Sequence, residues 1–161
     1  MTPSSLAEER QAVPSNKTLF LLLLGLLLAA ANMRAAITSV GPLTGWIRDD
    51  TGLSNGAMGG LTTIPLIGFA LLSPLAPVFA RKYGTERIVA ASLLVMTVGI
   101  GVRILEPVPL LFAGTAFVGA AIAILNVLMP SIVKKNFGNR VGFMTGLYSM
   151  TMSLFASVAS G

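Results

Sequence analysis

The sequence predicts an all-α membrane protein with about five transmembrane helices, and three observations lead to this fold class. The chain has 161 residues, of which 54% are hydrophobic and only 11% are charged, whereas soluble domains carry about 25% charged residues. Its mean hydropathy is +0.83. Apolar runs of about 20 residues, the length that an α-helix needs to cross the hydrocarbon core, recur at short intervals.

The expected elements begin with a polar tail and continue as apolar helices joined by short loops. Residues 1–17 show no apolar period, so we expect a disordered cytoplasmic tail. Pro42 should end the first helix, because proline lacks an N–H group, and a loop should follow at 43–53. Ser54 is a suitable N-cap for the second helix, which three prolines should kink. The predicted transmembrane segments are 18–41, 55–79, 88–105, 110–133 and 141–161.

Basic residues in the connecting segments predict the orientation of the chain. The tail has two, the second loop three and the fourth loop three, whereas the first loop has one and the third has none. Cytoplasmic loops carry the excess of Lys and Arg, so the N-terminus should be cytoplasmic in a multi-pass protein of the cell membrane. The net charge of +5 therefore reflects topology and does not indicate nucleic-acid binding.

Two arginines lie inside the predicted spans. Arg34 is about sixteen residues into the first helix, roughly 24 Å along its axis and past the bilayer centre. Ala30, Arg34 and Thr38 lie four residues apart and share one face, which suits a watery cavity, so Arg34 and Thr38 are candidate substrate-binding residues. The alternatives for Arg34 are snorkelling to the outer headgroups or a structural partner. Arg103, near the outer end of its helix, should snorkel and pair with Glu106.

Two further candidate binding residues lie on the fourth and fifth predicted helices. Asn126 should either bridge helices or face the cavity, and Pro130, four residues later, frees a backbone carbonyl. Tyr148 lies in a polar stripe with Thr145 and Thr151. Its alternatives are ligand contact and plain packing.

Small residues predict where helices approach closely. The pairs Gly56/Gly60 and Gly142/Gly146 have the four-residue spacing that permits close helix contact.

The residue types that are missing narrow the function. The sequence contains no cysteine and no histidine, and the predicted spans contain no Asp or Glu. Thiolate chemistry, imidazole ligands and the usual intramembrane carboxylate relay are therefore excluded within these residues. Phosphate-binding loops and paired carboxylates inside a span are also absent. We predict neither an enzyme nor a cofactor or metal site.

The loop after the second predicted helix resembles a known signature. "LSPLAPVFARKYGTER" (72–87) is similar to the cytoplasmic loop between helices 2 and 3 of the major facilitator superfamily. Gly84 matches the glycine of that loop, and Lys82 and Arg87 supply basic positions, which implies a cytoplasmic gating loop. Arg81 stands where the superfamily usually has an aspartate, which departs from its pattern.

Further stretches together resemble the cyanate and nitroimidazole permease family: "RAAITSVGPL", "GTAFVGAAIAILNVLMPSIVKKNF" and "TGLYSMTMS". The resemblance implies part of the N-terminal six-helix lobe of a two-lobed transporter, which works by alternating access around a central site. This chain would be an N-terminal fragment whose partners are the missing C-terminal lobe, the lipid bilayer and a small anionic or polar organic solute, such as cyanate or a nitroimidazole. The alternative is a non-transporting structural or assembly subunit of a membrane complex.

Overall fold

Long helices make up the chain in the computed structural model, which describes residues 16–105 and 107–160. Five of these helices are long and apolar enough to cross a membrane, so the predicted all-α membrane fold with five spans is confirmed. Most of the predicted tail lies outside the described residues. The elements are α2 (Asn16–Thr38), α3 (Val40–Thr51), α4 (Asn55–Leu72), α5 (Ala76–Tyr83), α6 (Thr85–Arg103), α7 (Val108–Phe137), the 3₁₀ turn η1 (Gly138–Arg140) and α8 (Val141–Ala159).

The break after the first span lies earlier than predicted. We expected a helix end at Pro42 and a loop at 43–53, but α3 occupies most of that loop. The proline ring clashes with the carbonyl four residues before it, and its missing N–H leaves that carbonyl without a partner. The affected carbonyl belongs to Thr38, so α2 ends there. Pro42 itself lies in the first turn of α3. The backbone N–H groups of a first turn have no partner within the helix, so proline removes no helical hydrogen bond there.

The second span begins as predicted and is divided by prolines. The Ser54 hydroxyl accepts a hydrogen bond from the Ala57 N–H at 3.3 Å, which confirms the N-cap. The helix is interrupted between Leu72 and Ala76 and resumes as α5. Pro77 explains this break, because its ring opposes the carbonyl of Ser73.

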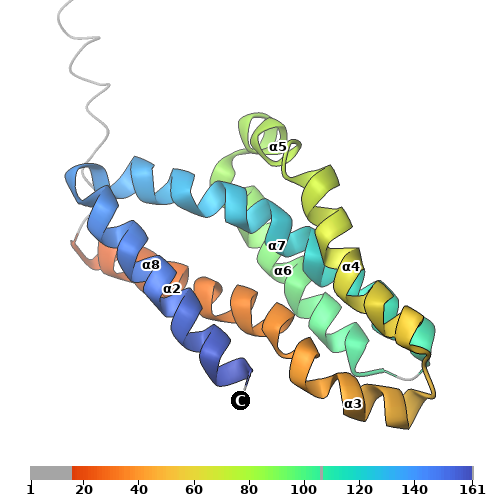
Figure 1. The fold of residues 1–161 in the computed structure, drawn as a ribbon. Helices are drawn as coiled ribbons and strands as arrows, with labels where there is room; N and C mark the ends of the chain where they lie inside the picture. Colours follow the sequence, from red (N-terminus) through yellow and green to blue (C-terminus); the bar gives the residue numbers. More distant parts are fainter. Residues whose placement is uncertain (1–15, 106, 161) are drawn as a thin grey trace, which may run out of the picture.

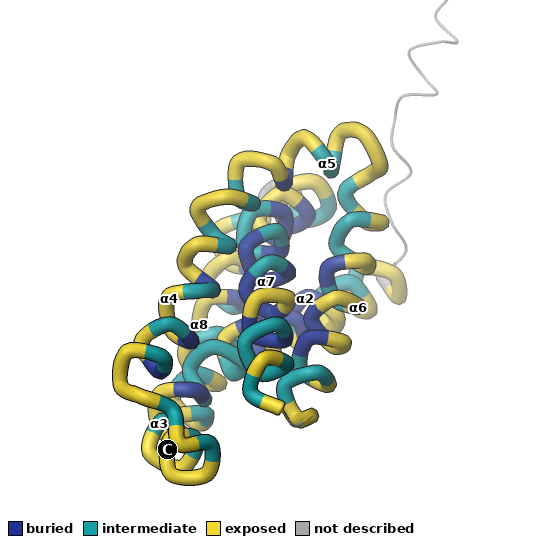
Figure 2. Tube along the Cα trace, turned by 90° about the vertical axis from the view of Figure 1, so that its right-hand side faces the viewer, coloured by how far each residue is buried: buried dark blue, intermediate teal, exposed yellow. Residues whose placement is uncertain are grey.

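α7 is the centre of the bundle. It is continuous for 30 residues and contains more buried positions than any other described helix, and these appear as a dark blue column in Figure 2. α4 and α6 lie alongside α7, whereas α2 pairs with α8 (Figure 1). α7 extends four residues beyond its predicted end at 133, and Lys134 and Lys135 in its last turn interact favourably with the helix dipole.

Close helix contact occurs at glycines other than the predicted ones. A methyl group on Gly114 of α7 would lie 2.6 Å from the Gly99 carbonyl oxygen of α6. A methyl group on Gly119 of α7 would lie 2.6 Å from the Pro65 Cα of α4. These two glycines therefore let α6 and α4 approach the backbone of α7.

The predicted glycine pairs make no such contact with the part of the chain that the structure describes. A Cβ at Gly142 or Gly146 would meet nothing within 4 Å, and at Gly60 the nearest atom would be a Phe112 ring carbon at 3.5 Å. The prediction is wrong because spacing identifies a face that permits close approach but does not say which helix face meets a neighbour.

Candidate functional site

Arg34 lies on the face of α2 that points away from α6. A cavity of about 330 Å³ separates α2 from α6, and Leu28, Ala29 and Asn32 line it from the α2 side. Arg34 follows Asn32 by two residues, which places it roughly 200° further around the helix. Its side chain is exposed, and its guanidinium makes no ion pair with any residue that the structure describes.

The stripe predicted at Ala30, Arg34 and Thr38 is shorter than the spacing suggests. Ala30 is completely buried in the core, so a solute could not contact it. The Thr38 hydroxyl donates its proton to the Arg34 carbonyl oxygen at 2.8 Å. In this arrangement Thr38 offers a ligand only its acceptor lone pairs.

Several polar groups lie close together in the turn of α7 that contains Asn126. Its side-chain amide donates to the Ile122 carbonyl oxygen at 3.1 Å, and the residue is partly buried. Pro130 lies four residues later and has no N–H, so the Asn126 backbone carbonyl lacks its helical partner. One turn of α7 therefore carries a free carbonyl, a side-chain amide oxygen and a second amide N–H.

Tyr148 is buried in α8. Its exposed fraction is 7%, and it belongs to the core cluster that includes Leu26, Met33 and Met129. Its hydroxyl has no hydrogen-bond partner within the described residues. Leaving a buried hydroxyl unpaired costs about 1–3 kcal/mol, so such groups normally meet protein, water or ligand. The polar stripe predicted at Thr145, Tyr148 and Thr151 does not lie in one environment, because Thr145 is exposed whereas Tyr148 is buried.

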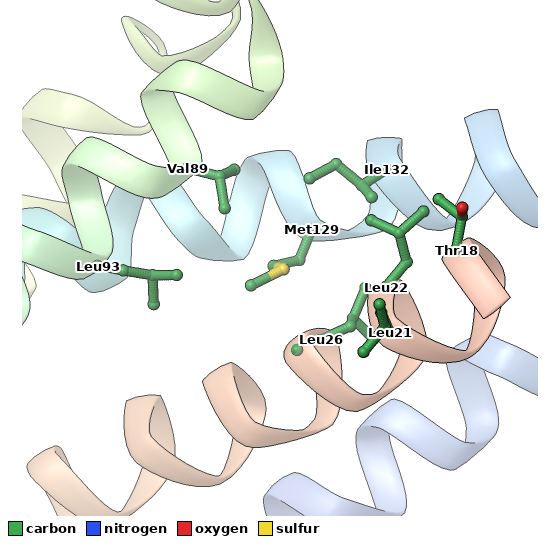
Figure 3. Close-up of a pocket in the computed structure, with 9 residues that line it drawn as sticks. Thr18, Leu21, Leu22, Leu26, Val89, Leu93, Met129 and Ile132 are labelled. Carbon is green, nitrogen blue, oxygen red and sulfur yellow. The ribbon is translucent and has the colours of Figure 1, made fainter. Parts of the chain in front are cut away.

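A larger cavity between α2, α6 and α7 is apolar. It has a volume of about 370 Å³, and Leu22, Leu26, Leu93 and Met129 are among the side chains around it (Figure 3). Thr18 supplies the one hydroxyl of its lining, so this cavity cannot orient a polar solute by hydrogen bonds. Neither this cavity nor the one beside Asn32 is lined by the predicted binding residues.

Asn32 is a polar residue that sequence reasoning missed. It is exposed and lines the 330 Å³ cavity opposite Thr97 of α6. Its side-chain amide donates to the Leu28 carbonyl oxygen at 2.9 Å. An amide two residues before Arg34, inside an apolar run, was the signal that could have identified it.

The predicted gating loop is a single-residue turn. Gly84 separates α5 from α6 with φ of +91°, a backbone conformation that favours glycine. Lys82 and Arg87 are exposed, and the Lys82 ammonium lies 5.2 Å from the centre of the Tyr83 ring. Beside the turn, Glu86 pairs with Lys135 at 3.4 Å, which joins the start of α6 to the end of α7.

Arg103 has a partner far along the sequence. Its guanidinium donates to the Ala36 carbonyl oxygen of α2 at 3.2 Å. The predicted partner, Glu106, lies outside the described residues. Arg103 thus connects α6 to the last turn of α2, where helix carbonyls lack internal partners.

Known proteins match most of the chain. The Major Facilitator Superfamily profile matches residues 22–161. The chain is 44% identical over 150 residues to the uncharacterized transporter YycB of Bacillus subtilis (strain 168). It is 42% identical over 146 residues to the 2-nitroimidazole transporter and 34% identical over 132 residues to the cyanate transport protein CynX, both of Escherichia coli (strain K12).

The matches cover most of this chain and about a third of each relative. They include 92%, 91% and 81% of this chain, but 37%, 37% and 34% of the respective relatives. No solved structure matches the chain. The five apolar helices, the profile match and these relatives all indicate a membrane transporter family. The chain belongs to the major facilitator superfamily, in the branch of the cyanate and nitroimidazole permeases.

Proposed function

We propose that the complete protein containing this chain carries a small anionic or polar organic solute, similar to cyanate or a nitroimidazole, across the cell membrane by alternating access. The chain would be the N-terminal part of the first lobe, with its N-terminus in the cytoplasm. The observation that carries the proposal is the exposed guanidinium of Arg34 within an apolar span, without an ionic partner among the described residues. The relatives named for transport of 2-nitroimidazole and cyanate support the substrate class.

The energetic argument concerns the cost of the charge. An arginine near the bilayer centre costs about 2.5–3.5 kcal/mol on insertion scales. Water and a negatively polarised solute that reach Arg34 would offset this cost. The guanidinium has a rigid fork of N–H donors that fits planar acceptors such as nitro groups. Attraction is also stronger in a partly dehydrated cavity, because the effective dielectric constant is lower there.

Asn126 and Tyr148 would orient the solute. An N-unsubstituted nitroimidazole has an acceptor nitro group and a ring N–H donor, so the nitro group would bind Arg34. The ring N–H would donate to the Asn126 carbonyl that Pro130 leaves free. Tyr148 would contribute its hydroxyl, which has no hydrogen-bond partner among the described residues. Thr38 would accept a further hydrogen bond. Cyanate has no N–H group, so it would depend on Arg34 and not on the free carbonyl.

The cytoplasmic turn would serve the conformational change. Lys82 near the end of α5 and Arg87 near the start of α6 flank the Gly84 turn. The exposed charges of Lys82 and Arg87 would contact the second lobe when the cytoplasmic side closes. Gly84 would keep the turn at one residue, because its positive φ strains any residue with a Cβ.

The test is solute uptake by the full-length protein in proteoliposomes. Arg34→Ala should abolish uptake, and Arg34→Lys should retain little, because lysine keeps the charge but loses the fork. Arg48→Lys is the matched control, since Arg48 is an exposed arginine outside the five candidate spans. Uptake that is unchanged in both Arg34 variants, with normal membrane insertion, would exclude Arg34 as the binding group.

A further inference from the structure

A small, partly open cavity lies beside the break between α2 and α3. Its volume is about 60 Å³, and residues of α2, α3, α4, α6 and α7 surround it. Ala36 and Val40 form the wall at the break, and Arg103 reaches the cavity from α6. Thr62 of α4 and Thr115 of α7 complete the polar part of the lining. This cavity is distinct from the face of α2 that carries Arg34.

The polar groups around this cavity are divided into one donor group and several acceptors. A guanidinium has five N–H donors, and among the described residues Arg103 makes one hydrogen bond, to the Ala36 carbonyl oxygen. Thr62 already donates to the Gly59 carbonyl oxygen at 2.8 Å, and Thr115 donates to the Leu111 carbonyl oxygen at 2.7 Å. Both hydroxyls therefore present only lone pairs to the cavity.

The α4 helix adds a further acceptor at the same level. Pro65, which lines the cavity with Leu61, has no N–H to donate to the Leu61 carbonyl. That carbonyl is therefore without its helical partner. An anion would meet these acceptors unfavourably, and an apolar group would offer no hydrogen-bond partner to Arg103, Thr62 or Thr115.

We infer that this cavity holds ordered water, which bridges the Arg103 guanidinium to the Thr62 and Thr115 hydroxyls. Water both donates and accepts, as this lining requires. A cavity needs at least about 10–15 Å³ of such space and two to four polar partners to hold a water molecule, so this one has room for at least one. The water would connect α4, α6 and α7 at the point where α2 is broken. Arg103 would then hold α6 in position against α4 and α7 through this water.

A double-mutant cycle tests the bridge in the full-length protein. The melting temperature in detergent is measured for Arg103→Met, Thr115→Val and the double variant. If water connects the two side chains, Thr115→Val should lower the melting temperature, and this shift should nearly vanish in the Arg103→Met background. Thr97→Val is the matched control, because the exposed Thr97 hydroxyl bonds its own helix at Leu93. Its shift should be the same in both backgrounds.

Two further measurements keep the inference falsifiable. If Arg103→Met does not fold, Thr62→Val and Thr115→Val form the same cycle without removing the arginine. A density map that shows internal water elsewhere in the protein should show density within hydrogen-bond distance of Arg103 and Thr115. Additive melting shifts, or an empty cavity in such a map, would overturn the inference. Neither result would affect the proposed role of Arg34.

Discussion

The contact between α4 and α7 predicts a large penalty for one added methyl group. In Gly119→Ala, the new Cβ would lie 2.6 Å from the Pro65 Cα, whereas ordinary van der Waals contact begins at 3.4 Å. The two backbones must therefore separate by about 0.8 Å. The obstructing atom is backbone, so a change of side-chain rotamer cannot relieve the clash. Overpacking of this kind costs about 1–3 kcal/mol.

The assay is thermal unfolding of the full-length protein in detergent, with Gly101→Ala as the matched control. A Cβ at Gly101 on α6 would meet nothing within 4 Å. The control should be neutral or up to about 1 kcal/mol more stable, because alanine has the higher helix propensity. Only Gly119→Ala should therefore lower the melting temperature. Equal melting temperatures for the two variants would refute the packing of α4 against α7 described here.

Three further predictions follow from individual contacts. Ser54→Ala should lower stability by about 0.5–2 kcal/mol in chemical unfolding, because it removes the N-cap of α4; Ser54→Thr should restore most of it. Glu86→Gln should change the melting temperature very little, because the Glu86–Lys135 pair is exposed to solvent and such pairs contribute about 0–1 kcal/mol; a large loss would show that this contact is underestimated. Pro130→Ala returns an N–H to the Asn126 carbonyl, so nitroimidazole uptake should fall while cyanate uptake persists; an equal effect on both would contradict the proposed hydrogen bond.

Local chemistry was sufficient to predict the fold class. The five spans follow from the length of the apolar runs, and the cap at Ser54 follows from its hydroxyl. Pro42 was recognised as a breaker, but its effect falls on the carbonyl four residues earlier. The expected helix end was therefore misplaced by one turn.

Contacts between helices could not be predicted in the same way. Gly114 and Gly119 pack closely because of the neighbours that α7 meets, and sequence spacing contains no such information. The partner of Arg103 lies 67 residues away, at the Ala36 carbonyl. A carboxylate near Arg103 can be seen in the sequence, whereas a backbone acceptor that a helix break exposes cannot.

The candidate site was predictable in residue type but not in arrangement. An arginine inside an apolar run is costly wherever it points, so Arg34 stands out from the sequence alone. The burial of Tyr148 depends on how α8 packs with α2 and α7. The Tyr148 hydroxyl has no hydrogen-bond partner among the described residues, and this follows from the packing of the core around it, which the sequence does not specify.

Water access to position 34 tests the central claim most directly. The 161-residue sequence has no cysteine, so Arg34→Cys introduces one defined thiol into this part of the full-length protein, once any cysteines elsewhere have been replaced. Thiols react with a charged, membrane-impermeant methanethiosulfonate only where water reaches them, because the thiolate is the reactive form. We expect rapid labelling at position 34 in intact membranes and none at position 26, where Leu26→Cys would be buried in the core. If position 34 is as unreactive as position 26, the guanidinium does not face a watery route, and the proposed recognition of a polar solute is contradicted.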